Sequence, residues 1–160
     1  MPQPPTGSDS TGAADRVVSM SPIGYVETGY ALPRDAPPQA TMAYGDQGRA
    51  VVFERFAEGL AGLSAARHVW LLTWLHQQTD EETTPLRVVP RAWEGSGRTT
   101  GVYATRTPNR HNRIGLSLVR VSAVEDNIVY FYGVDLADGT PVLDIKPWSP
   151  GSDTPPEEQT

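Results

Sequence analysis

The sequence predicts an all-β fold, a small single-domain β-barrel with one short helix. Most apolar residues alternate with polar ones or form short continuous runs, a pattern typical of strands. One segment alone has helical spacing, with Phe56, Leu60 and Leu63 at positions i, i+4 and i+7. Strands at short spacing with almost no helix favour a closed or nearly closed barrel.

Eight segments have the alternation or the β-branched and aromatic content of strands. In chain order they are Val17–Val26, Arg49–Glu54, His68–His76, Leu86–Arg91, Gly101–Thr105, Leu116–Val124, Asn127–Val134 and Val142–Ile145. The acidic turn Glu125-Asp126 separates the sixth segment from the seventh and predicts a hairpin. The helix is expected over Phe56–Ala66. A loop rich in Pro and Gly is expected near residues 30–48, and a loop of that length in a compact domain usually carries function.

The 160 residues fit one domain between two tails. Residues 1–15 and 149–160 are rich in Pro, Gly, Ser, Thr and acidic residues, and they hold too few apolar side chains to offset the entropy of ordering them. We therefore expect disordered termini around a barrel domain over residues 16–148. The chain has no cysteine, which excludes a disulfide framework, a zinc-thiolate site and a thiol nucleophile.

The charge of the chain is uneven. The formal net charge is −6, but the tails hold five of the acidic residues, namely Asp9, Asp15, Asp153, Glu157 and Glu158. The remaining part is nearly neutral, and within it the stretch Arg98–Arg120 carries five arginines and no acid. Such a stretch suits the binding of an anion, unless its arginines are scattered over several faces.

Several function classes lack their sequence signal. Three histidines, His68, His76 and His111, are too dispersed to predict a metal site, and we expect none. The motifs of P-loop, Rossmann and serine-hydrolase proteins are absent. No apolar run approaches the ~18 residues of a membrane-spanning helix, and no secretion signal opens the chain. We expect a cytoplasmic protein with no membrane partner.

Two segments concentrate polar side chains. Residues 101–120, GVYATRTPNRHNRIGLSLVR, predict a strand, a polar turn ended by Gly115, and a second strand. The Arg side chains and backbone N–H groups of that turn could converge on a carboxylate or a phosphate. The second segment, DLADGTPVLDIKPW, places Asp144 and Lys146 on one face of a strand. It also fits a plain hairpin turn followed by an exposed ion pair that contributes little.

Together these segments resemble the TrmO (TsaA-like) family of S-adenosylmethionine-dependent methyltransferases. The family pattern is G-V-(F/Y)-A-T-R-S-P-x-R-P-N-P-I-G-x-S-x-V followed by D-G-T-P-(V/L)-(L/V)-D-I-K-P-Y. The corresponding stretches here are GVYATRTPNRHNRIGLSLV and DGTPVLDIKPW. The segments SPIGYVETGY, LPRD and GLAGLSAARHVWLLTWLH are similar to further family elements, so the resemblance covers roughly residues 21–148.

The resemblance implies a barrel, typically a homodimer, that binds S-adenosylmethionine and methylates the exocyclic nitrogen of a threonylcarbamoyl-adenosine beside the tRNA anticodon. It assigns cofactor binding to the residues that match the pattern, which are Arg106, Arg110, Asn112, Ile114, Gly115, Asp138, Gly139, Thr140, Pro141 and Lys146. Asp144 or His76 is expected to accept the proton that the nucleophile loses. Methyl transfer from a sulfonium requires alignment and a proton acceptor, and it needs no metal.

Three residues depart from the family pattern near the expected acceptor side. His111 and Arg113 replace the two prolines of the turn, which loosens it and adds a cation and a titratable ring. Asp35 replaces the Gln of a P-R-Q element in the long loop. We expect Arg34, His111 and Arg113 to contact the acceptor.

Three functions are compatible with these residues. The first is a methyltransferase that acts on tRNA, as the resemblance implies. The second is a methyltransferase for a small molecule in a biosynthetic pathway, which would explain the changed turn as a reshaped acceptor pocket. The third is a non-catalytic module that binds S-adenosylmethionine. A barrel scaffold does not by itself name the acceptor.

Overall fold

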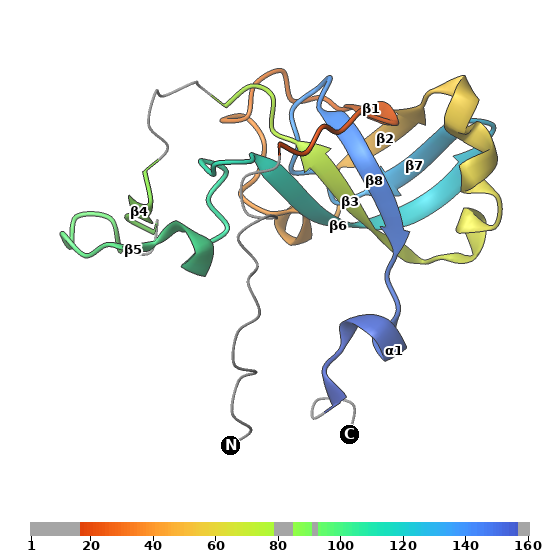
Figure 1. Ribbon diagram of the computed structural model, residues 1–160. Coiled ribbons are helices and arrows are strands. Elements are labelled where there is room, and N and C mark those ends of the chain that lie inside the picture. Colours follow the sequence, from red (N-terminus) through yellow and green to blue (C-terminus); the bar gives the residue numbers. More distant parts are fainter. Residues whose placement is uncertain (1–16, 79–84, 91–92, 157–160) are drawn as a thin grey trace, which may run out of the picture.

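Six strands close a barrel in the computed structural model, which describes residues 17–78, 85–90 and 93–156 (Figure 1). The order around the barrel is β1-β2-β7-β6-β3-β8, and every neighbouring pair is antiparallel. The strands are β1 (Gly24–Glu27), β2 (Gln47–Val52), β3 (His68–Trp74), β6 (Ile114–Glu125), β7 (Ile128–Tyr132) and β8 (Pro141–Pro147). The predicted all-β barrel is confirmed.

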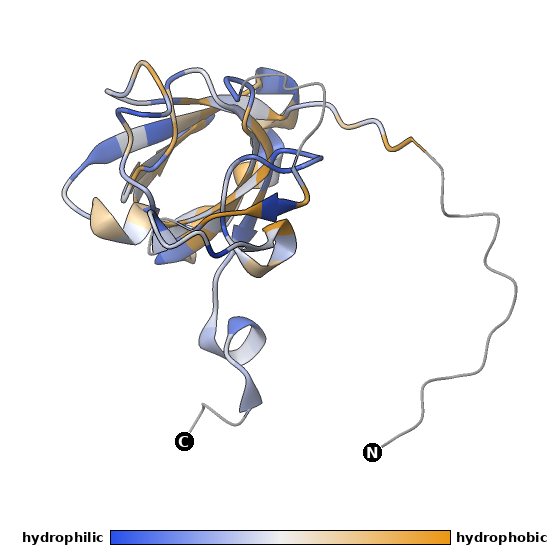
Figure 2. Cartoon of the chain, turned by 90° about the vertical axis from the view of Figure 1, so that its left-hand side faces the viewer, coloured by the Kyte–Doolittle hydropathy of each residue, from blue (hydrophilic) through white to orange (hydrophobic). Residues whose placement is uncertain are grey.

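Alternate side chains of each strand point into the barrel and form its core. On β3, Val69, Leu71 and Thr73 are buried, and the residues between them lie on the outer face. Phe131 of β7 and Val142 of β8 fill the same interior. Figure 2 shows the strands as a ring, seen nearly along the barrel axis. Each strand therefore leaves one face for contacts outside the core.

Short elements connect the strands. They are the 3₁₀ helices η1 (Ala40–Met42), η2 (Glu54–Leu60), η3 (Leu63–Ala65) and η5 (Val102–Ala104), the two-stranded sheet of β4 (Arg87–Val88) and β5 (Thr100–Gly101), and the helix α1 (Pro150–Asp153). The sheet of β4 and β5 lies beside the barrel in Figure 1. Among the described residues, no helix is long and apolar enough to cross a membrane.

Three of the predicted strands are wrong over part of their length. The strand expected over Val17–Val26 begins only at Gly24, and Val17 is 93% exposed. The strand expected over Gly101–Thr105 ends at Gly101, where the chain enters η5. Of the strand expected over 86–91, only the two residues of β4 pair with a neighbour among the described residues, and Arg91 lies outside them. A strand needs a partner for its backbone groups, and apolar alternation alone does not supply one.

The segment predicted as one helix over Phe56–Ala66 is helical, but it forms two 3₁₀ helices, η2 and η3, instead of one continuous helix. Gly62 lies between them with a φ angle of 83°, in the left-handed region that favours glycine and ends a helix. Leu60 of η2 is nevertheless buried against the barrel core, as the helical spacing predicted.

The segment after β8 contains the helix α1, although the sequence assigns residues 149–160 to a tail. The Asp153 carboxylate accepts hydrogen bonds from the Ser149 N–H at 2.7 Å and from Trp70 Nε1 at 3.0 Å. The bond from Trp70 connects α1 to the outer face of β3. Residues 1–16 and 157–160 of the expected tails lie outside the described residues.

Candidate functional site

One end of the barrel gathers most of the motif residues. Because the strands are antiparallel, the carboxyl ends of β1, β3 and β7 meet the amino ends of β2, β6 and β8 there. We call this region the motif end and define it by residues 28–31, 45–47, 75–78, 113–115, 133–135 and 138–141. Segments more than a hundred residues apart in the chain are in contact here, as between Thr28 and Asp138.

The turn of residues 138–141 uses its polar groups to hold the chain together. The Asp138 carboxylate accepts the Thr28 N–H at 2.9 Å, and the Asp138 N–H donates to the Tyr30 carbonyl at 2.7 Å. Gly139 has a φ angle of 73°, which the turn requires of a residue without a side chain. Thr140 is buried and donates its hydroxyl to Ala137 O at 2.6 Å. Pro141, next in the chain, pairs with Tyr25 at the start of β8.

The entry into β6 lies directly against the end of β3. Ile114 pairs with Trp74, and Gly115 pairs with Thr73. A Cβ atom on Gly115 would lie 2.4 Å from Thr73 Oγ1, so only glycine allows this approach. The preceding Arg113 has a φ angle of 51°, its carbonyl accepts the Leu75 N–H at 2.9 Å, and its Nη1 donates to the carbonyl of Gln78 at 3.2 Å.

Three buried polar atoms at the end of β3 have no hydrogen-bond partner in the described part of the chain. They are Thr73 Oγ1, His76 Nδ1 and Gln77 Oε1. Buried polar atoms in folded proteins are nearly always paired, so such a cluster marks a place for a polar ligand or for a rearrangement on binding. The Gln77 side chain also donates from Nε2 to the Ala31 carbonyl at 3.4 Å, which connects the end of β3 to the long loop.

Arg106 and Arg110 have different surroundings in the turn before β6. Nη1 of Arg110 donates to the carbonyls of Thr105 at 2.8 Å and Val102 at 3.3 Å, and its guanidinium lies 5.8 Å from the centre of the Tyr103 ring. Arg110 therefore holds the turn together. The Arg106 side chain is exposed, and it has no partner among the described residues, so its guanidinium is free for an anion.

His111, Asn112 and Arg34 lie on the surface. His111 and Asn112 are exposed in the turn before β6. Arg34 is exposed in the long loop, where its side chain lies 4.0 Å from the Asp35 carboxylate. Contacts this open contribute little to stability, and they leave the side chains available to a ligand.

Asp144 and Lys146 lie on the outer wall of the barrel, away from the turn of residues 138–141 in which β8 begins. Lys146 Nζ is 2.8 Å from Asp144 Oδ2, and both side chains are about half exposed. The other carboxylate oxygen, Oδ1, accepts the Ile145 N–H at 2.9 Å. Their neighbours across the sheet are Leu72 and Trp70 of β3. The geometry is that of an exposed ion pair on a sheet face.

Sequence reasoning missed Asp135, which lies three residues after the end of β7. Its carboxylate accepts hydrogen bonds from Ser117 Oγ at 2.6 Å and from the Ala40 N–H at 2.8 Å. Burial raises the pKa of Asp135, although these hydrogen bonds oppose the shift. The residue joins β6, β7 and the long loop at the motif end. Its place shortly after a strand rich in apolar residues was the available signal.

The sequence profile described as tRNA-methyltransferase O N-terminal domain matches residues 25–154. The chain belongs to this family. RcsF of Pseudomonas aeruginosa, named for a proposed S-adenosylmethionine-dependent methyltransferase activity, is 40% identical to it over 137 residues. The tRNA (adenine(37)-N6)-methyltransferase of Mus musculus is 37% identical over 138 residues. Each match covers 84% of this chain, which spans 58% of the length of RcsF and 31% of that of the mouse enzyme.

The barrel is also that of TrmO. A crystal structure of TrmO matches with a TM-score of 0.71 and 35% sequence identity, over 91% of this chain and 64% of that one. The family resemblance seen in the motifs is thereby confirmed, and so is the fold that it implies.

The residues at the motif end, together with Arg106 of the turn before β6, fit S-adenosylmethionine, the cofactor that the name of RcsF specifies. This molecule carries a carboxylate, an ammonium group, a ribose diol and an adenine. The free guanidinium of Arg106 suits the carboxylate. The acceptors His76 Nδ1 and Gln77 Oε1, which lack a partner in the described part of the chain, suit N–H and O–H donors. No three metal-ligating side chains cluster anywhere in the described ranges.

Proposed function

We propose that the chain binds S-adenosylmethionine at the motif end and transfers its methyl group to an amino nitrogen of an adenosine in tRNA. The observation that carries this proposal is the set of unpartnered acceptors at the end of β3, beside the turn that leads into β6. Family membership and the names of the relatives support the cofactor and the acceptor. S-adenosylmethionine supplies an electrophilic methyl group on a sulfonium.

Arg106 holds the carboxylate of the cofactor in this proposal, because its guanidinium has no other partner in the described part of the chain. Arg110, Gly115 and the turn of residues 138–141 hold the backbone around it. Asn112 and Ile114 complete the residues that hold the cofactor in this proposal. Lys146 pairs with Trp70 near the start of β3, away from the motif end, so its assignment depends on the family motif alone.

His76 is the better proton acceptor of the two candidates. Its Nδ1 atom has no partner among the described residues, whereas the Asp144 carboxylate is already paired with Lys146 and with a backbone N–H. A proton acceptor needs a free lone pair within reach of the nitrogen that reacts. His76→Gln, which keeps an acceptor but cannot take up a proton, therefore lowers kcat more than Asp144→Asn does.

The surface around the turn before β6 favours tRNA over a small acceptor. The side chains of Arg106 and His111 are exposed there, and Arg113 follows two residues later. Together with Arg34 of the long loop they provide contacts for phosphates, which dominate RNA affinity. A tRNA acceptor also implies a cytoplasmic reaction. The second candidate, a small-molecule acceptor, is favoured by the loss of both prolines from the family turn.

We further propose that a second copy of the chain covers the outer face of β6 and β3. Trp74, Ile114 and Leu116 project from this face and remain 43%, 40% and 54% exposed. Neighbouring apolar side chains of this size are typical of a surface buried on association. Light scattering of the wild type should give the dimer mass. Leu116→Glu should give the monomer mass. Leu86 is exposed just before β4, away from this face, so Leu86→Glu should leave the dimer intact.

The experiment that tests the function uses S-adenosylmethionine labelled in its methyl group. The protein is incubated with the cofactor and either bulk tRNA or an extract of small metabolites. Label in the tRNA, lost on Arg106→Ala, supports the proposal. Label only in the small-molecule fraction selects the second candidate, and label in neither fraction leaves a binding module without transferase activity.

A further inference from the structure

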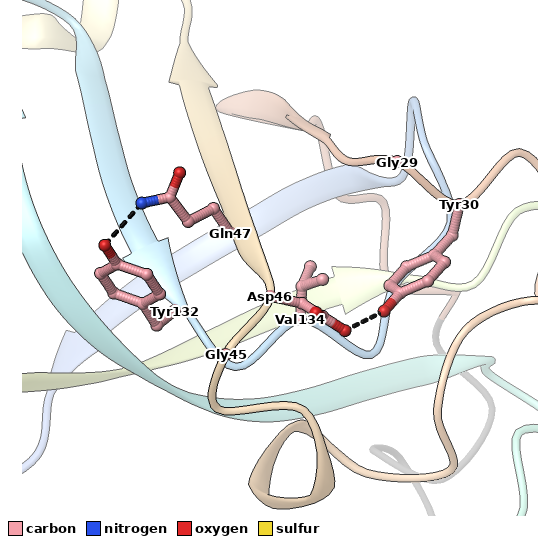
Figure 3. A pocket seen from close by; sticks show the side chains of 7 residues that line it. All are labelled: Gly29, Tyr30, Gly45, Asp46, Gln47, Tyr132 and Val134. Atoms are coloured by element: carbon pink, nitrogen blue, oxygen red, sulfur yellow. Dashed lines mark hydrogen bonds between the residues drawn. The ribbon is translucent and has the colours of Figure 1, made fainter.

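A pocket that none of the residues assigned to cofactor binding lines opens at the motif end (Figure 3). Its volume is about 580 Å³, which lies in the range of small-molecule sites. Tyr30, Asp46, Gln47 and Tyr132 form its walls together with Gly29 and Gly45, and the buried side chain of Val134 also lines it. The pocket thus combines two aromatic rings, an apolar side chain and a few polar groups.

The polar walls are held in place by hydrogen bonds. The Tyr30 hydroxyl donates to the Asp46 carboxylate, and Gln47 Nε2 donates to the Tyr132 hydroxyl, as Figure 3 shows. The bond to Asp46 raises the pKa of Tyr30, so the phenol stays protonated. The guanidinium of Arg120 lies 4.5 Å from the centre of the Tyr132 ring and fixes it from another side. A ligand therefore meets groups that are already oriented.

The pocket is rich in hydrogen-bond acceptors and has no cationic side chain among its lining residues. The Asp46 carboxylate has one oxygen bonded to Tyr30, and its other oxygen has no partner in the described part of the chain. Such a site repels phosphate and carboxylate groups, because a second anion would lie beside Asp46. It suits a neutral or cationic group that donates N–H bonds and has a planar surface to lie along tyrosine rings.

Hydrogen bonds connect this pocket to the turn of residues 138–141. The Tyr30 carbonyl accepts the Asp138 N–H at 2.7 Å, and the Asp46 carbonyl accepts the Gly133 N–H at 3.0 Å. The wall of the pocket and the turn of residues 138–141 are therefore direct neighbours. An acceptor bound in the pocket would lie at the same end of the barrel as the cofactor.

We propose that this pocket is the acceptor subsite, and that it binds a planar heterocycle whose exocyclic amino group donates to the Asp46 carboxylate. The inference rests on the proposed function and extends it to residues outside the set assigned to cofactor binding. Asp46 selects the amino group, and Tyr30 holds Asp46 in place.

The test is a titration of the ¹⁵N-labelled chain with adenosine, followed by NMR in the presence of saturating S-adenosylhomocysteine. Adenosine should shift the amide signals of Gly29, Gly45 and Val134 saturably. Purine riboside, which lacks the amino group, should bind at least about ten-fold more weakly. Asp46→Asn should weaken adenosine binding by a similar factor, since it removes the charge, and Tyr30→Phe should weaken it several-fold.

Asp126→Asn is the matched control, because it removes one negative charge from the exposed turn between β6 and β7, at the opposite end of the barrel. It should leave adenosine binding unchanged. Failure of adenosine to bind while S-adenosylhomocysteine is saturating, or equal affinity for adenosine and purine riboside, overturns the proposal. The proposal is also overturned if the wild type transfers methyl groups but Asp46→Asn binds adenosine as tightly as the wild type does. In that case the proposed function stands. If adenosine binding depends on Asp46 but no acceptor is methylated, the proposed function fails and takes the acceptor role with it.

Discussion

Replacing Asp135 tests how the long loop is attached to the barrel. The Asp135 carboxylate accepts hydrogen bonds from Ser117 Oγ at 2.6 Å and from the Ala40 N–H at 2.8 Å. Ala40 is only 3% exposed, so little water can reach its N–H if the partner is lost. Asp135→Ala leaves this buried donor unpaired, and that should lower the free energy of unfolding by about 1–3 kcal/mol.

Asp135→Asn separates the hydrogen bonds from the charge. The amide oxygen can accept the Ala40 N–H and the amide nitrogen can donate to Ser117 Oγ, so both contacts are kept. The raised pKa of Asp135, caused mainly by burial, means that the folded chain binds this proton more tightly than the unfolded chain. The contribution of the wild-type carboxyl is therefore greatest below its unfolded pKa, falls as the pH rises through its folded pKa, and is constant above it.

Urea unfolding of the wild type and both variants, from acidic to neutral pH, measures these effects. We expect Asp135→Ala to be the less stable variant at neutral pH. The free energy of unfolding of the wild type, minus that of Asp135→Asn, should fall as the pH rises. A difference that grows with pH, or an Asp135→Ala variant as stable as the wild type, would refute the reasoning.

Three further predictions follow from the site. Gly115→Ala forces a Cβ to within 2.4 Å of Thr73 Oγ1 and should lower the free energy of unfolding by about 1–3 kcal/mol in thermal melts. Arg113→Pro should destabilise by more than about 1 kcal/mol, because proline cannot adopt the φ angle of 51°; an unchanged melting temperature would contradict this. Arg106→Lys keeps the charge but loses the planar fork, so calorimetry should show about ten- to a hundred-fold weaker S-adenosylmethionine binding. A lower melting temperature for Arg106→Lys would instead indicate a structural role.

The barrel could be predicted from the sequence because its long strands alternate strictly. On β3 and β7 every second residue is buried, and the turn between β6 and β7 falls at Asp126, which has a φ angle of 51°. The start of β1 could not be predicted, since Val17 and Val18 are as apolar as core residues but have no strand beside them. Pairing depends on tertiary context that alternation does not encode.

The candidate site was predictable as a set of segments and less so as individual contacts. The motifs located the turn before β6 and the turn of residues 138–141, which the barrel brings to one end. They did not show that Arg110 is occupied by backbone carbonyls while Arg106 is free. The motifs also did not predict that Asp46 lies at the site. The long loop has no periodicity, and the contacts of Asp46 arise only when β2 and β7 pair.

The departure of Arg113 from the family turn has a physical basis that spacing could not reveal. Its φ angle of 51° is incompatible with the proline of the family pattern, so this chain adopts a turn that a proline would not allow. Its side chain also reaches the carbonyl of Gln78, which the sequence places 35 residues away.

Calorimetric titration of the pure chain with S-adenosylmethionine and S-adenosylhomocysteine tests the central claim most directly. The proposal predicts saturable binding of both compounds at one site per chain, strongly weakened in Arg106→Ala and retained in the control Arg98→Ala, whose guanidinium lies over the Trp93 ring near the sheet of β4 and β5. The absence of binding of either compound at high micromolar concentration would contradict it.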